Sequence, residues 1–209
     1  MVALIAVSVL GTMAYLTSKD TVTNTFTVGN VTITLDEAKV NVDGEKLYVP
    51  ADKTETVGFT GYVTESEGNA PAKRVSANEY KLMPGHFYTK DPTVHVDANS
   101  ENCYLFVKVT DDIATYEDDT TIADQLKANG WEAVTGKPGV YVYTQNNEKA
   151  AVAGGTDVAV FASFKLKDDA DVSKINKDTA KIEITAYAIQ ADGFTSKTPA
   201  DIWDAAKFE

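Results

Sequence analysis

One run of residues near the middle of the chain, 103–109, constrains the fold more than any other. It reads Cys-Tyr-Leu-Phe-Val-Lys-Val. Its odd-numbered residues are all apolar and would share one face of a β-strand, and the even-numbered Tyr104 and Phe106 would share the other. A strand that is apolar on both faces must be covered on both sides. The run therefore predicts the central strand of a sheet that other elements bury from above and below.

Shorter strand-like runs recur along the rest of the chain, with turn signals about every 8–12 residues. Two of the clearest runs are 158–166 and 182–189, and typical turn signals are Asp43-Gly44 and Pro84-Gly85. This pattern is typical of an antiparallel β-sandwich, so we expect a mainly β protein. By its length, 15–209 is a single domain with a substantial core.

Only two helices are predicted inside this sandwich. The first covers 119–130, where Asp119 or Thr120 is the expected N-cap and Gly130 ends the helix. The second is short and lies near the C-terminus, where Thr198 and Asp201 have capping-box spacing around Pro199.

The first 14 residues differ in composition from everything that follows. They are uncharged and apolar, and they end in small residues, as a signal peptide does before its cleavage site. We expect cleavage between Ala14 and Tyr15. The apolar run is shorter than the ~20 residues that a helical span needs. We therefore expect no stable membrane span in the mature chain. The run lacks a basic start, and the alternative is that it forms a buried helix or strand of the fold.

A strand-like segment, 15–28, would then begin the mature chain. Val22, Phe26 and Val28 fall on one face, with Thr and Asn between them, and Gly29-Asn30 predicts a bulge or tight turn. A β-prone terminus of this kind can leave its own sheet and pair with the open edge of a neighbouring molecule. Residues 15–28 are therefore a candidate donor strand, and the alternative is that they pair within their own sheet.

Charge and cysteine content restrict the classes of partner. The chain of 209 residues has a net charge of −12, none of it in 1–14. This charge argues against binding of nucleic acid or of an anionic membrane surface. The single cysteine, Cys103, excludes an internal disulfide and is expected to be a small buried hydrophobe.

The sequence offers little material for catalysis. Its two histidines, His86 and His95, are expected to be surface residues, and no His-Glu-x-x-His motif occurs. Three acidic clusters are expected to be solvated turns rather than Ca²⁺ sites, because none has the spacing of an EF-hand loop. They are 111–112, 117–119 and 168–171. We therefore predict no enzymatic activity, no catalytic or metal-binding residues and no cofactor.

Five segments together resemble one known family. They read Ala-Tyr-Leu-Thr at 14–17, Asn-Thr-Phe-Thr-Val-Gly-Asn-Val at 24–31, Met-Pro-Gly to Lys-Asp-Pro-Thr-Val at 83–94, Cys-Tyr-Leu-Phe-Val-Lys-Val at 103–109 and Ile-Thr-Ala-Tyr-Ala-Ile-Gln-Ala at 184–191. Their order and spacing are similar to those of the TasA/camelysin family, which are secreted biofilm-matrix and surface-fibre proteins of Gram-positive bacteria with a SipW-type signal peptide. The missing basic start departs from the family pattern.

The resemblance implies a jelly-roll-like sandwich, export with cleavage by a SipW-like signal peptidase, and assembly by donor-strand exchange. We therefore expect a secreted structural subunit of an extracellular fibre or biofilm matrix, whose partners are further copies of itself and other matrix proteins. Two alternatives remain open. One is a camelysin-like cell-surface metallopeptidase, although the two-His-plus-Glu arrangement for zinc is missing, and the other is a monomeric surface adhesin or binding module.

Overall fold

The computed structural model describes residues 30–50, 63–64, 72–176 and 180–209. These residues form a mainly β, antiparallel structure with two short α-helices and two 3₁₀ turns, as the sequence predicts. The strands are β1 (Ile33–Ala38), β2 (Arg74–Val75), β3 (Phe87–Thr89), β4 (Thr93–Val96), β5 (Cys103–Asp111), β6 (Trp131–Ala133), β7 (Val140–Gln145), β8 (Glu148–Lys149), β9 (Ala151–Val152), β10 (Asp157–Ala159), β11 (Ser163–Lys165) and β12 (Ile182–Gln190). The helical elements are η1 (Ala114–Tyr116), α2 (Ile122–Ala128), η2 (Val172–Lys174) and α3 (Pro199–Ala206).

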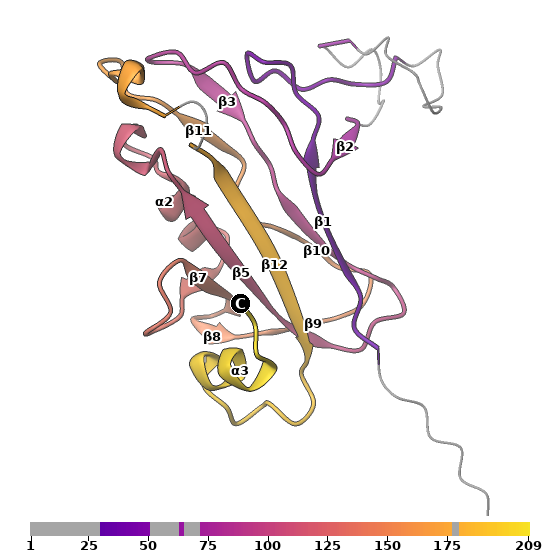
Figure 1. Ribbon diagram of the computed structural model, residues 1–209. Helices are drawn as coiled ribbons and strands as arrows, with labels where there is room; N and C mark the ends of the chain where they lie inside the picture. The colour runs from indigo at the N-terminus through magenta and orange to yellow at the C-terminus, as the bar shows by residue number, and fades with distance from the viewer. Residues whose placement is uncertain (1–29, 51–62, 65–71, 177–179) are drawn as a thin grey trace, which may run out of the picture.

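The strands form two larger sheets and one small one. The larger sheets have the orders β12-β5-β7-β6 and β10-β4-β1-β2, and β11 pairs with β3 in the small one. All pairs are antiparallel. Figure 1 shows the long strands β5 and β12 beside each other, with β1 next to β12. The sandwich is thus confirmed, and the jelly-roll connection of its strands stays a prediction.

The central strand is β5, as its sequence predicts. Residues 103–107 are all buried, and β5 is paired along its whole length with β12, from Cys103 opposite Gln190 to Asp111 opposite Ile182. The side chains on the two faces of β5 pack in two different apolar cores. Leu105 and Val107 belong to the main core between the sheets, which also contains Val94 of β4 and Val158 of β10.

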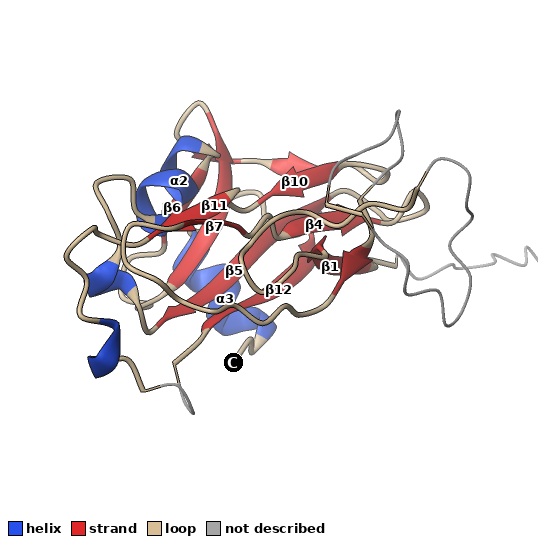
Figure 2. Ribbon diagram, turned by 90° about the horizontal axis from the view of Figure 1, so that it is seen from above, coloured by secondary structure: helices blue, strands red, loops and turns tan. Residues whose placement is uncertain are grey.

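The face of the β12-β5-β7-β6 sheet that points away from the main core is covered by the C-terminal helix. Phe106 of β5 packs with Ile202 and Trp203 of α3 in a second apolar cluster, and Figure 2 shows α3 against that sheet. Helix α3 begins as predicted, because Thr198 and Asp201 form the reciprocal capping box with Pro199 in the first turn.

Two local predictions are wrong in detail. The run 158–166 is not one strand: β10 pairs with β4, β11 pairs with β3, and the chain changes sheet between them. Val160 and Phe161 are both buried there, which breaks the alternation that a single half-buried strand requires. The first helix is also shorter than expected and is capped by Thr121, because only Thr121 has Asp124 three residues later to complete a capping box.

Candidate functional site: a groove between two strand edges

Two strand edges of the described sheets, one of β1 and one of β12, lie near each other. Strand β12 pairs with β5 on one side, and no described strand pairs with its other side. Strand β1 pairs with β4 over Ile33–Asp36, whereas β2 pairs only with Glu37 and Ala38 on the opposite side of β1. The free stretches of the two edges approach each other. Unpaired N–H and C=O groups of this kind are a template for a further strand.

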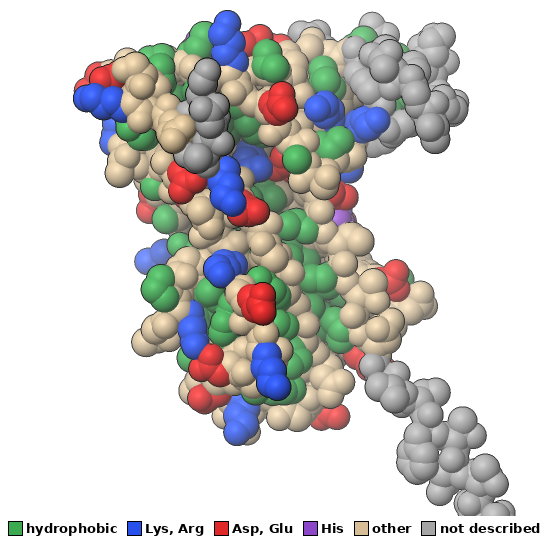
Figure 3. Space-filling model, in the orientation of Figure 1, with side chains coloured by type: hydrophobic (Ala, Val, Ile, Leu, Met, Phe, Trp, Pro, Cys, Tyr) green, Lys and Arg blue, Asp and Glu red, His purple; other side chains and the backbone are tan. Residues whose placement is uncertain are grey.

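A groove lies between the last residues of β1 and the first residues of β12, and we call it the β1–β12 groove. It consists of two adjoining hollows of about 440 and 290 Å³, which share Asn78, Lys90, Lys181 and Ile182 in their walls. The lining of the second hollow includes residues of both strands, among them Leu35 of β1 and Ile184 of β12. On the face that Figure 3 shows, hydrophobic side chains lie exposed along the middle of the molecule.

The apolar side chains at the groove are only half covered. On β12 the even-numbered residues 182–188 face the main core, and each keeps part of its surface in solvent. On β1 the same holds for Ile33 and Leu35. The main core is therefore incompletely closed along this edge, and an added strand with apolar side chains on one face would bury this surface.

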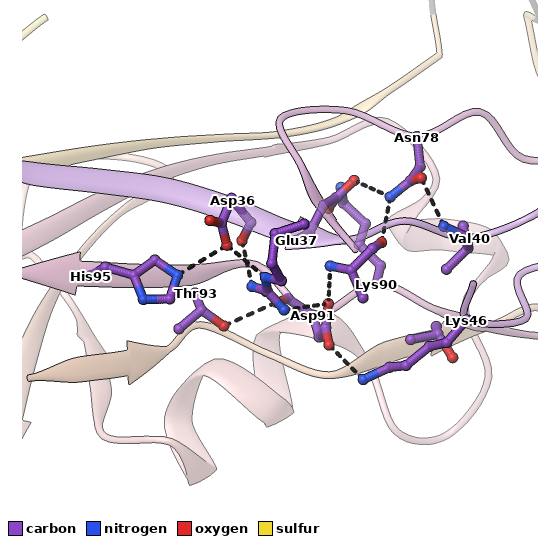
Figure 4. Close-up of polar contacts among 12 residues, drawn as sticks. Asp36, Glu37, Val40, Lys46, Asn78, Lys90, Asp91, Thr93 and His95 are labelled. Carbon is purple, nitrogen blue, oxygen red and sulfur yellow. Dashed lines mark hydrogen bonds and ion pairs between the residues drawn. The ribbon is translucent and has the colours of Figure 1, made fainter. Parts of the chain in front are cut away.

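One end of the groove is lined by a polar network from β1 and its neighbours, which Figure 4 shows. Glu37 is buried and accepts hydrogen bonds from Lys90 Nζ at 2.6 Å and Asn78 Nδ2 at 2.9 Å. Asn78 also accepts from the backbone N–H of Val40, at 3.0 Å, and donates to the carbonyl of Ala38 at 2.8 Å. These bonds fix the position of the segment after β2 against the end of β1.

Asp36, the neighbour of Glu37 on β1, points to the opposite side of the strand. Its Oδ1 lies 2.7 Å from Arg74 Nε and 2.9 Å from His95 Nε2. Partial burial acts to raise the pKa of Asp36, but the hydrogen bonds from His95 and Arg74 outweigh it and hold the pKa below its ordinary value. Asp36 is therefore a charged carboxylate in the wall of the groove over the physiological pH range.

The acidic clusters that the sequence singles out serve local roles in the structure. Asp118 forms an ion pair with Lys165, at 2.5 Å, and Asp111 accepts a hydrogen bond from the backbone of Ile113, at 3.0 Å. Within the described residues, no group of three or more His, Cys, Asp or Glu side chains is arranged to hold a metal ion. Cys103 is buried and free, as predicted, and burial raises the pKa of its thiol to about 11.

The predicted site residues at the start of the chain lie outside the described residues. These are the cleavage-site residues Ala14 and Tyr15 and the candidate donor-strand residues Val22, Phe26 and Val28. The described residues begin at Asn30, three positions before β1. Residues 31–35, in contrast, lead into and form part of β1, which pairs with β4 of the same molecule.

Sequence reasoning missed two features, of which only the first contacts a residue of the groove wall. His95 is not a plain surface residue, because it contacts carboxylates from β1 and β10, and Glu117 is a buried carboxylate that the sequence shows only as part of an acidic cluster. The partners of His95 are about 60 residues away in the sequence on either side, so no local spacing predicts them. The only available signal was the position of His95 between Val94 and Val96 on a predicted strand.

Comparisons of the chain with protein-family models, with curated proteins and with solved structures found no match. Among the residues that the structure covers, no helix has both the length and the apolar character needed to cross a membrane.

Proposed function

We propose that this chain is a secreted, non-enzymatic subunit of an extracellular fibre or biofilm matrix, joined to its neighbours by donor-strand exchange. In this proposal, the segment 15–28 of one copy fills the β1–β12 groove of the next. The single observation that carries it is the groove itself, with two unpaired strand edges and half-covered apolar side chains between them. The resemblance of the five sequence segments to the TasA/camelysin family supports the same function.

The donor segment has the chemistry that such a groove requires. Its apolar residues Val22, Phe26 and Val28 are four and two positions apart, so in an extended chain they would point to one side. That side would complete the core beside Leu35 and Ile184, while backbone groups of the donor bond to the free edges. Because donor and acceptor are different surfaces of the same molecule, the contact is head-to-tail, and it extends into a filament unless the rotation closes a ring.

The competing arrangement is pairing within one molecule. The segment precedes β1 directly, and a tight turn at Gly29-Asn30 would return it along the free edge of its own β1. The groove would then be filled in each monomer, and the protein would act as a surface adhesin or binding module. Both arrangements bury the same apolar surface, so only the oligomeric state separates them.

The first test compares the mature chain starting at Tyr15 with a chain that lacks 15–28, by negative-stain electron microscopy and light scattering. We expect filaments from the longer chain and monomers from the shorter one. A synthetic peptide of residues 15–28 should bind the shorter chain, and the same peptide with Phe26→Asp should bind at least about tenfold more weakly, because burying a charge in the groove is unfavourable. Monomers from both chains at every salt concentration and pH would refute the fibre and favour the adhesin.

A matched pair of groove variants locates the acceptor. Ile184→Lys places a charge inside the groove, whereas Thr185→Lys places the same charge on the exposed face of β12. We expect Ile184→Lys to abolish filaments and peptide binding and Thr185→Lys to preserve both, with circular dichroism as the check that each variant is folded. Equal assembly of the two variants would exclude this groove as the acceptor.

A further inference from the structure

The side chain of His95 joins three strands of the four-stranded sheet. His95 lies on β4, which is the strand between β1 and β10. Its Nε2 lies 2.9 Å from Oδ1 of Asp36 on β1, and its Nδ1 lies 2.7 Å from Oδ1 of Asp157 on β10. Asp157 is the direct cross-strand partner of His95, and Asp36 is two residues from its cross-strand partner Thr34. Both ring nitrogens therefore contact carboxylates that come from opposite sides.

The number of protons fixes the charge that this arrangement requires. A neutral imidazole carries one N–H, and an ionised carboxylate can only accept hydrogen bonds. Both carboxylates can therefore accept a hydrogen bond from the ring only when His95 is an imidazolium, which carries an N–H on each nitrogen. Loss of one proton leaves an imidazole nitrogen facing a carboxylate oxygen, and two acceptors then repel each other.

The charges around His95 balance only in the protonated state. Asp36 also accepts from Arg74 of β2, and Arg74 lies 3.5 Å from Asp91, which binds Lys46 at 2.7 Å. With Asp157, the cluster contains three carboxylates, and the protonated His95 with Arg74 and Lys46 supplies three cations. Deprotonation of His95 removes one of these cations and leaves the cluster with one excess negative charge, in a chain whose net charge is −12 when its histidines are neutral.

We propose that His95 is a pH-dependent clamp, which as an imidazolium binds the carboxylates of β1 and β10 to β4 and releases one of these carboxylates when it loses its proton, so that the strand concerned is then held to β4 by its backbone pairing alone. The clamp is a property of the free subunit and does not depend on the proposed function. It acts on β1, the strand that forms one wall of the β1–β12 groove.

The direction of the pH dependence follows from the contacts of His95. Burial acts to lower the pKa of His95, but the hydrogen bonds to Asp36 and Asp157 outweigh it and raise the pKa above the ordinary value of 6.5. The stabilisation is therefore fully present below about pH 6.5 and is lost as the pH rises through the folded-state pKa. The clamp should be closed in mildly acidic surroundings and open in alkaline ones.

The test is a histidine titration by ¹H–¹⁵N nuclear magnetic resonance. The His86→Gln variant leaves His95 as the only histidine, so its signals need no further assignment. We expect ¹⁵N shifts typical of two protonated ring nitrogens at about pH 6, and a midpoint above 6.5. Asp157→Asn and Asp36→Asn should each lower this midpoint by roughly half a unit or more, whereas Asp192→Asn, which removes the same charge in the turn after β12, should leave it unchanged.

The titration of the chain with its carboxylates intact decides the proposal even if a variant fails to fold. A midpoint at or below 6.5, or a ring with one protonated nitrogen at pH 6, would overturn it. So would a midpoint that a folded Asp157→Asn variant does not change. Urea unfolding above about pH 7 gives a second measurement: stability should fall as the pH rises, and the fall should be smaller in His95→Gln than in the chain with His95.

Discussion

Glu37 and Glu117 are the two most deeply buried glutamates among the described residues, at 4% and 2% exposure. They differ in the hydrogen bonds that their carboxylate oxygens accept. Both oxygens of Glu37 are bonded, one to the ammonium of Lys90 and one to the amide of Asn78. Glu117 accepts one bond, at 3.0 Å from the backbone N–H of Ile122, and its Oε1 is buried with no partner in the described part of the chain.

The difference lies in what surrounds each carboxylate. Glu37 has a buried cation beside it, whereas the charged neighbours of Glu117 are Asp111 and Asp124, which are acidic as well. Burial raises the pKa of Glu117 to about 7, against the opposing effect of the bond from Ile122. The comparison shows that burial alone does not decide the state of a carboxylate. Glu37 is a fixed structural link beside the groove, and Glu117 is a group that titrates near neutral pH.

The largest expected effect comes from removing the cation at Glu37. Lys90→Met leaves the carboxylate buried without its counter-charge and should lower the free energy of unfolding by about 3–5 kcal/mol. The matched control is Lys46→Met, whose partner Asp91 lies nearer the surface, and it should cost at most about 1 kcal/mol. Urea unfolding at neutral pH measures both. Adding Glu37→Gln to Lys90→Met should recover much of the loss, and failure to recover it would show that packing of the lysine stem matters more than its charge.

The second prediction concerns the pH dependence caused by Glu117. Its folded-state pKa is raised from 4.5 to about 7, so the stability that depends on its proton is full below pH 4.5 and is lost as the pH rises to about 7. Glu117→Gln keeps the shape without the charge and should remove a decline of up to about 3 kcal/mol between about pH 4.5 and pH 7. Urea unfolding across this range is the measurement. If Glu117→Gln instead lowers the free energy of unfolding by the same amount at both ends of the range, the titration of Glu117 is contradicted. The loss would then come from a missing hydrogen bond.

The smallest effect of the three main substitutions is expected from leaving one oxygen of Glu37 without a hydrogen-bond donor, as Oε1 of Glu117 is. Asn78→Ala removes the donor to one oxygen of Glu37 and also the acceptor for the backbone of Val40. We expect a loss of about 1–2 kcal/mol, because Glu37 keeps its bond to the ammonium of Lys90 and loses only the neutral hydrogen bond from the amide. Thermal unfolding gives the value, and a loss as large as that of Lys90→Met would mean that the amide, and not the ammonium, holds Glu37 in place.

The parts of the fold that sequence reasoning predicted are those set by neighbouring residues. The central strand follows from apolar side chains at consecutive positions 103–107, and helix α3 follows from the spacing of Thr198 and Asp201. The break after Ala159 was not predictable in this way, because it depends on β10 and β11 pairing with β4 and β3, more than 60 residues earlier in the chain. The same holds for the candidate site. Leu35 and Ile184 each read as ordinary strand residues, and only the tertiary fold brings them to one groove.

The β1–β12 groove is formed by the first and the last of the described strands. The acceptor therefore needs both ends of the described chain to be folded side by side. Under the proposed function, a subunit accepts the next one only after β12 has folded beside β1, so a filament is extended only through subunits whose folding is complete.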